Sequence, residues 1–124
     1  MNLTLLPVEI VITIHDEILN PGELVGMAGD KSLDGALARV ENRLNYGLLS
    51  DVFDLAAAYA IAIARGHCFN DGNKRTAYRV MQTCLDLHGM NFPRDEAEIG
   101  PVIILAAQGK IDEGELAHWL RQRL

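Results

Sequence analysis

The chain has 124 residues, of which 49% are hydrophobic and 23% are charged, and its formal net charge is −6. This length predicts a single domain over residues 1–124 with one hydrophobic core. The negative charge argues against nonspecific nucleic-acid binding, which depends on many contacts with phosphates.

The cysteines and the start of the chain indicate the cellular compartment. The chain has two cysteines, Cys68 and Cys84, and nothing in their positions indicates a disulfide framework. The first residues lack the basic and long apolar regions of a secretion signal, and no apolar run is long enough to cross a membrane. We therefore expect a cytoplasmic protein with no membrane partner and no direct nucleic-acid partner.

The first predicted element is a helix over residues 7–19, with Pro7 at its first position. The β-branched run at residues 10–14 leaves a strand as the alternative. Residues 20–31, which contain a proline and three glycines, predict a loop. The apolar face of the helix consists of Val8, Val11, Ile12, His15, Ile18 and Leu19.

Two further helices follow in chain order. The first is predicted to run from a cap at Asp30 or Ser32 to about Tyr46. The second is predicted over residues 51–65, with Ser50 as its cap. It is so rich in alanine and other apolar residues that we expect it to be the buried centre of the fold.

The second half of the chain predicts more helices. One is expected over residues 73–88, with Asn73 or Asp71 as its cap and Gly89 as its stop. Its apolar positions are Ala77, Val80, Met81, Cys84, Leu85 and His88.

The C-terminal elements are marked by their caps and breakers. Asp95 is expected to start a helix that Gly100–Pro101 breaks or kinks. Asp112 and Glu115 form a capping box at the start of the last helix. The elements together predict an all-α fold, a compact bundle of about six helices.

The start of the helix at residue 73 carries two cations, Lys74 and Arg75, in its first turn. This is the unfavourable end for cations, because a helix N-terminus already carries positive partial charge and unpaired N–H donors. A local rule that is broken without structural gain points to a functional site. Helix-start amides together with two cations predict a binding site for a phosphate or a carboxylate.

The residues just before this helix indicate what chemistry takes place there. Asp71 offers a hard oxygen ligand that suits Mg²⁺. His67, on the loop side, can take a proton from an attacking hydroxyl, and Phe69 between them can anchor the loop in the core. A base, a metal ligand and a phosphate cradle are the parts that phosphoryl or nucleotidyl transfer requires.

Each of these residues also has a simpler interpretation. His67 can be a structural histidine, Asp71 a helix cap, and Lys74 and Arg75 a solvated helix end. For Lys74 the interpretation as a solvated helix end is weakened, because Lys74 shares a helix face with the predicted apolar positions and is not expected to point freely into solvent.

The neighbouring side chains leave their roles open at this stage. Arg65 and Arg79 can extend the phosphate site or lie on the surface. Cys68 beside His67 is a weak candidate for a nucleophile–base pair, because adjacent side chains generally point apart.

The run from residue 67 to residue 75 resembles the signature of the Fic/Doc superfamily, His-x-Phe-x-Asp-x-Asn-x-Arg. The matching residues are His67, Phe69, Asp71, Asn73 and Arg75. Similarity to Doc-type chains extends to His15–Asp16 and to residues 51–58 and 109–120, and so covers essentially the whole sequence.

The differences within the motif point to the Doc branch. Adenylylating Fic enzymes usually have proline after the histidine and the sequence Asn-Gly-Arg, where this chain has Cys68 and Lys74. Gly72 stands where the best-known Doc pattern has alanine.

The resemblance implies a toxin with protein kinase activity. Such an enzyme transfers the γ-phosphoryl group of ATP to a threonine hydroxyl of elongation factor Tu and so arrests translation. In this scheme His67 is the base and Asp71 holds Mg²⁺. The phosphates are held by Gly72, Asn73, Lys74 and Arg75.

The resemblance also implies a neutralising antitoxin of the Phd-like kind. Many Fic enzymes carry their own inhibitory motif, Ser/Thr-x-x-x-Glu-Gly/Asn. Glu41–Asn42 and Glu113–Gly114 match its end, but Leu37 and Gly109 occupy its first position. Two alternatives stay open: an adenylyltransferase that uses the same histidine, and a non-catalytic anion-binding partner protein.

Overall fold

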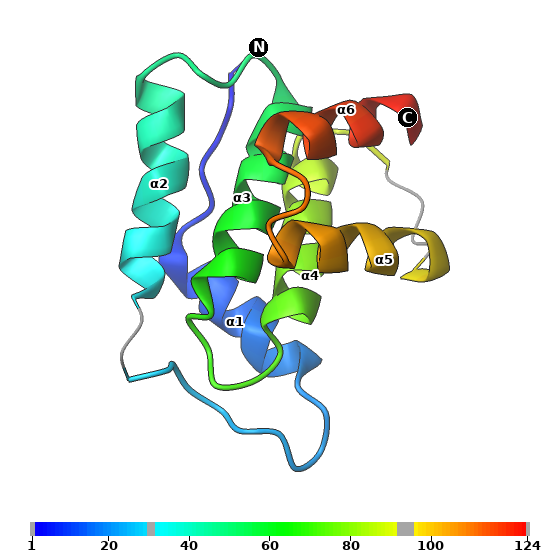
Figure 1. The fold of residues 1–124 in the computed structure, drawn as a ribbon. Helices are drawn as coiled ribbons and strands as arrows, with labels where there is room; N and C mark the ends of the chain where they lie inside the picture. The colour runs from blue at the N-terminus through cyan, green and yellow to red at the C-terminus, as the bar shows by residue number, and fades with distance from the viewer. Residues whose placement is uncertain (1, 30–31, 92–95, 124) are drawn as a thin grey trace.

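The structure, a computed structural model, describes residues 2–29, 32–91 and 96–123. These ranges contain six helices and no strand, which confirms the predicted all-α fold (Figure 1). The helices are α1 (Val8–Ile18), α2 (Leu33–Asn45), α3 (Val52–Gly66), α4 (Asn73–Leu87), α5 (Glu96–Ala107) and α6 (Glu113–Arg123).

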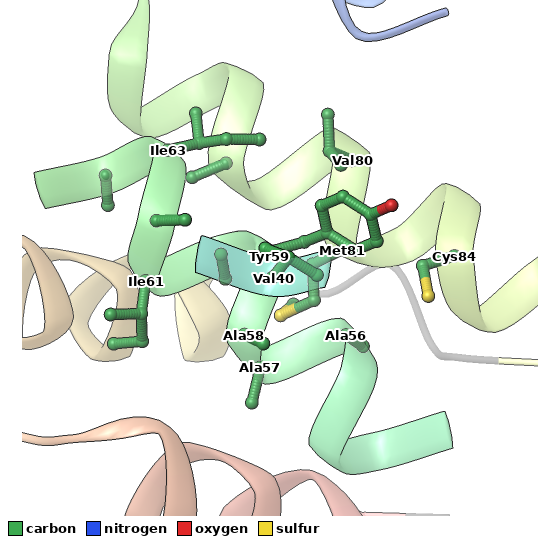
Figure 2. Close-up of a cluster of buried hydrophobic side chains, with 14 of the residues drawn as sticks. Val40, Ala56, Ala57, Ala58, Tyr59, Ile61, Ile63, Val80, Met81 and Cys84 are labelled. Atoms are coloured by element: carbon green, nitrogen blue, oxygen red, sulfur yellow. The ribbon is translucent and has the colours of Figure 1, made fainter. Parts of the chain in front are cut away.

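Helix α3 is the centre of the fold, as its composition predicts. It contacts α2, α4, α5 and α6, while α1 lies across α4 (Figure 1). Every residue from Leu55 to Ala64 is buried. The alanines allow the neighbouring helices to approach closely, and Tyr59 and Ile63 pack with Val80 and Met81 of α4 in the core (Figure 2).

Helix α1 settles the alternative between helix and strand. It begins one residue later than predicted, with Pro7 as the cap position rather than the first helical residue. Val11, Ile14 and His15 are its buried residues. Burial of positions i, i+3 and i+4 is the pattern of one helix face, and this packing overrides the strand preference of the β-branched residues.

Two helix caps show where side-chain chemistry decides a boundary. Ser32 caps α2 as predicted, because its hydroxyl accepts a hydrogen bond of 3.0 Å from the amide of Gly35. Asp30, the alternative cap, lies outside the described residues. The prediction of Ser50 as the cap of α3 is wrong, since Asp51 holds that position and accepts from the amide of Asp54.

The region of α5 excludes one of two predicted alternatives. Asp95, the expected start, lies outside the described residues, and α5 continues through Pro101, so the helix does not break there and a kink stays a prediction. Proline removes one backbone hydrogen bond from a helix. Ile99, Ile103 and Ala106 are buried on either side of it, so packing against α3 and α4 keeps the helix continuous.

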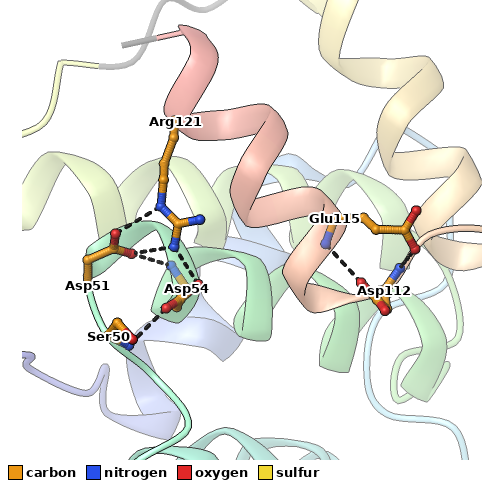
Figure 3. Close-up of polar contacts among 6 residues, drawn as sticks. All are labelled: Ser50, Asp51, Asp54, Asp112, Glu115 and Arg121. Atoms are coloured by element: carbon orange, nitrogen blue, oxygen red, sulfur yellow. Dashed lines mark hydrogen bonds and ion pairs between the residues drawn. The ribbon is translucent and has the colours of Figure 1, made fainter.

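The last helix starts with the predicted capping box. The amide of Glu115 donates to Asp112 at 2.8 Å, and the amide of Asp112 donates to Glu115 at 3.2 Å (Figure 3). Arg121 then ties α6 to the start of α3 through Asp51 and Asp54 (Figure 3). Within the described ranges, no helix is both long and apolar enough to cross a membrane.

Candidate phosphate-transfer site at the start of α4

The loop between α3 and α4 begins at His67, which has left-handed backbone angles of φ 48° and ψ 41°. Among the described residues it is the one non-glycine residue with positive φ. This conformation costs on the order of 1–3 kcal/mol outside glycine, and such residues cluster at functional sites. His67 is also exposed, so its imidazole faces solvent at the end of the buried helix.

A buried histidine on α1 supports the loop from beneath. The ring of His15 stacks on Phe69 with centroids 3.7 Å apart, and its Nε2–H donates to the backbone carbonyl of Asp71 at 2.7 Å. Its Nδ1 lies 3.1 Å from a carboxylate oxygen of Asp16. Phe69 anchors the loop in the core as predicted, and His15 fixes the backbone at the carboxylate that the sequence assigns to a metal.

The segment after α1 supports the loop from the other side. Met27 and Phe69 form an isolated antiparallel bridge, and the amide of Asn70 donates to the carbonyl of Gly26 at 3.1 Å. The amide of Leu24 donates to Oδ2 of Asp71 at 2.8 Å. Residues 24–27, within the predicted loop, therefore hold the motif loop in place.

The start of α4 differs from the predicted cap. Gly72 holds the cap position and makes no side-chain bond, so neither Asn73 nor Asp71 is the cap. The side chain of Asn73 instead bonds to the backbone of Phe69: its Nδ2 donates to the carbonyl at 2.9 Å, and its Oδ1 accepts from the N–H at 3.1 Å. Both predicted cap residues are thus used to shape the loop, and the first amides of α4 receive no side-chain cap.

Gly72 suits a position that has positive φ and lies close to the end of α1. It has positive φ, and a Cβ at this position would lie 3.2 Å from side-chain atoms of both Ile18 and Leu19. An alanine would combine left-handed strain with tight contacts. The glycine therefore lets α1 approach the loop directly under the start of α4.

Arg75 is already held by a carboxylate and a carbonyl. Its guanidinium donates to Glu23 and, at 2.7 Å, to the backbone carbonyl of Ile18. The Arg75 guanidinium holds the pKa of Glu23 below its usual value, so the pair persists on acidification until the pH falls through that lowered pKa. A phosphate that binds Arg75 must share the arginine with Glu23 or displace it.

Lys74 is more exposed than its helix face predicts. The structure leaves it exposed, although it shares a helix face with the buried Ala77 and Met81. At the first turn its long side chain extends past the end of the core, so the helix face alone does not bury it.

The structure brings all the predicted site residues to one cavity, which we call the loop cavity. It has a volume of about 320 Å³, and Asp71 is its one carboxylate among the described lining residues. Its lining includes His67, Asp71, Gly72, Asn73, Lys74 and Arg75. These residues span nine positions of the sequence, from residue 67 to residue 75. The positive φ at His67 and at Gly72 turns the chain between α3 and α4 so that they line one cavity.

The other three candidate residues, Arg65, Cys68 and Arg79, do not line the loop cavity. Arg65 donates to the carbonyls of Ala106 and Ile111, and so fastens the connection between α5 and α6. Cys68 is buried next to the carbonyl of Ser32, which removes it from any nucleophile role with His67. Arg79 lines a separate cavity between α4 and α5.

Sequence reasoning did not assign a role at the site to His15, Glu23 or Leu24. His15 carried a signal, since a histidine on an otherwise apolar helix face must find polar partners when buried. The contacts of Glu23 and Leu24 carried none, because they depend on how the loop after α1 returns to α4.

The arrangement combines an exposed imidazole, a carboxylate, two cations and the amides of a helix start. Mg²⁺ is compatible with this donor set: one oxygen of Asp71 accepts from Leu24, and the carboxylate also lines the cavity beside the cations. With one carboxylate from the protein, the remaining ligands of such an ion would be phosphate oxygens and waters, as is usual for magnesium.

Comparisons with known proteins identify relatives of this chain. The profile of the Fic/DOC family matches residues 5–85. The protein kinase doc of Escherichia phage P1 is 36% identical over 115 residues, which cover 92% of this chain and 90% of that protein. The toxin Doc of Mycolicibacterium smegmatis is 38% identical over 65 residues, which cover 51% of this chain and 49% of that protein.

Proposed function

Because this chain belongs to the Fic/DOC family, with Doc protein kinase and Doc toxin as relatives, we propose that it is a toxin that phosphorylates a protein. The proposed donor is ATP, and the proposed acceptor is a threonine hydroxyl of elongation factor Tu. Phosphorylation of that factor would arrest translation. The observation that carries the proposal is the loop cavity, in which a histidine, a carboxylate and two cations line one space at a helix start.

His67 is the proposed general base. Its exposed imidazole takes the proton of the threonine hydroxyl as the oxygen attacks the γ-phosphorus of ATP. A bond forms between that oxygen and the phosphorus, the bond from the phosphorus to the β,γ-bridging oxygen breaks, and ADP leaves. The products are phosphothreonine and ADP, with the proton on His67.

The phosphates of ATP are held by the start of α4. Its first amides, from Asn73 onward, receive no side-chain cap and can donate to phosphate oxygens. Lys74 and Arg75 supply positive charge, and Gly72, at the cap position, forms part of the same cavity wall. Mg²⁺ bound through Asp71 would neutralise charge on the β- and γ-phosphates.

Transfer from ATP labelled at either end tests the reaction. Label from γ-labelled ATP should appear on elongation factor Tu, label from α-labelled ATP should not, and ADP should be the product. Mass spectrometry of the intact target should show one added phosphate. Addition of AMP instead would replace the kinase proposal by an adenylyltransferase, and stable ATP binding without any transfer would leave an anion-binding partner.

Lys74 is the residue that favours γ-transfer over AMP transfer. Adenylylating relatives have glycine at this position, which lets phosphates approach the backbone closely. A lysine side chain fills that space and offers a point charge instead. Lys74→Gly should therefore reduce phosphorylation, and any AMP transfer that it gains would show that this position selects the orientation of the nucleotide.

The toxin relative supports a cognate antitoxin as partner, and we propose a small Phd-like protein that lays an apolar helix face in a groove. Neither glutamate that matches the inhibitory motif lines the loop cavity: Glu113 pairs with Arg43 at 3.0 Å, and Glu41 lines a cavity beside the N-terminal segment. Expression of the chain alone should arrest growth, and co-expression of the antitoxin should restore it. Normal growth with the chain alone would contradict both roles.

A further inference from the structure

A second cavity lies between α2, α3 and the start of α6, and we call it the arginine cavity. Its volume is about 330 Å³, close to that of the loop cavity. The apolar part of its lining is almost fully buried and consists of Val40, Ala58, Ile61 and Ala62. The charged part of its lining consists of Arg39, Arg43, Arg65 and Glu113.

This cavity gathers positive charge in a chain whose net charge is −6. Among the described lining residues, three guanidinium groups face a single carboxylate, that of Glu113. A guanidinium group binds carboxylates and phosphates through paired N–H donors. The charged lining therefore predicts an anionic ligand.

The present contacts of these arginines leave donors unused. Nη1 of Arg43 lies 3.0 Å from Oε2 of Glu113, but Nε of Arg43 is buried with no hydrogen-bond partner among the described residues. Arg39 is exposed and forms no ion pair with any residue that the structure describes. Arg65 is held by two backbone carbonyls, and its Nη1 lies 4.0 Å from Glu113. Because a buried donor without an acceptor is unfavourable, an additional anion would complete this arrangement.

The arginine cavity extends toward the end of α3 where the proposed base lies. The α3 residues that line it, from Ala58 to Arg65, follow the spacing of one helix face along the last two turns. His67 is the C-terminal cap of α3 and comes two residues after Arg65, and two residues span at most about 7 Å. A protein whose threonine hydroxyl reaches His67 therefore lies against this end of α3.

The loop cavity alone offers such a protein little to bind. Its described lining is polar except for Ala64 and Gly72, and its cations are needed for the phosphates. The arginine cavity combines guanidinium groups with apolar surface, and arginine is enriched where proteins bind one another. A free phosphate ion would use the guanidinium groups but not the apolar lining, whereas a peptide segment with acidic and apolar side chains would use both.

On the premise of the proposed function, we infer that the arginine cavity binds an acidic segment of the acceptor protein and so holds the threonine of that protein at His67. Acidic side chains of the segment pair with Arg39 and Arg43, and an apolar neighbour fills the space beside Ile61. This contact selects the protein that is phosphorylated. It is separate from the residues that carry out the transfer.

Two variants test the contact without touching the loop cavity. Arg39→Glu reverses the charge of an exposed residue, so the fold should persist and an acidic segment should be repelled. Arg43→Gln removes the second charge and keeps a side chain that forms hydrogen bonds. Lys110→Glu is the matched control, because it makes the same charge change at an exposed residue between α5 and α6 that does not line the arginine cavity.

Steady-state transfer from γ-labelled ATP, with each substrate varied in turn, separates docking from chemistry. In both variants the KM for elongation factor Tu should rise about tenfold or more, the loss expected for one hydrogen bond between charged groups. The KM for ATP and kcat should stay within about twofold, and Lys110→Glu should change none of the three. Added salt should raise the KM for the factor more in the unmodified protein than in Arg39→Glu, because screening weakens a contact that the variant has already lost.

The possible failures are distinguishable. An unchanged KM for the factor in both variants would overturn the inference and leave the kinase proposal standing. Loss of antitoxin binding in those variants, with the KM unchanged, would assign the arginine cavity to the antitoxin instead. If the unmodified protein transferred no label, calorimetric binding of the factor would decide: binding that Arg39→Glu weakens would keep the docking site and remove the kinase proposal, and absence of binding would remove both.

Discussion

Replacing His67 by alanine is expected to reduce phosphoryl transfer by a factor of about 10²–10⁴, the usual contribution of a general base. The imidazole is exposed at the end of α3 and adds little to the core, so the fold should persist. Transfer from γ-labelled ATP under saturating nucleotide measures the loss. Growth arrest should disappear with it, because the proposed toxicity depends on turnover.

The backbone at His67 makes a second variant necessary. Its φ of 48° is unfavourable for alanine, so His67→Ala alone mixes loss of the base with a change in loop conformation. Asparagine tolerates the left-handed region and stays neutral, so His67→Asn removes the base while preserving the turn. Both variants should lose transfer, and His118→Ala, at an exposed histidine of α6, should retain it. A folded His67→Asn protein with normal turnover would exclude His67 as the base.

The fold could be predicted from the sequence where periodicity and burial agree. The apolar positions predicted for α4 are buried except His88, which is half-buried at the end of the helix, and the polar Thr76 and Gln82 are buried as well. The alanine-rich α3 lies at the centre, because a helix that is apolar on nearly all sides is buried on nearly all sides. Boundaries were less certain where two polar residues compete. Ser50 and Asp51 are both residue types that cap helices well. Asp51 is the cap of α3, and it also forms an ion pair with Arg121, a distant residue of α6.

At the candidate site, too, local features could be predicted from the sequence and long-range contacts could not. The residues from His67 to Arg75 could be identified together because their side-chain types break the local rules of a helix start. The contacts of His15 with Asp71 and of Glu23 with Arg75 could not be identified, since they join positions more than fifty residues apart in the sequence. Such contacts follow from the docking of α1 on α4, which no local pattern encodes.

The expected effect of Asp71→Asn is a loss of Mg²⁺-dependent nucleotide binding, with little change in the fold. The asparagine oxygen can still accept the amide of Leu24, and the backbone carbonyl that His15 holds is unchanged. The substitution therefore removes the negative charge and leaves the loop in place. Apparent Mg²⁺ affinity should fall by at least about 10–100-fold, the loss seen when even the outer partners of a metal site are changed.

Titration of transfer activity with Mg²⁺ distinguishes this role from a purely structural one. Excess Mg²⁺ should partly restore the activity of Asp71→Asn, because mass action can offset a weakened ligand, whereas a misfolded loop would not respond. Asp16→Asn is the matched control: it removes a carboxylate that contacts the same buried His15 but does not line the loop cavity. If the two variants had the same Mg²⁺ dependence as the unmodified protein, Asp71 would shape the loop without binding the metal. The negative charge would then have to act on the cations at the start of α4, where it would weaken the hold on phosphate, and Asp71→Asn would bind tripolyphosphate more tightly.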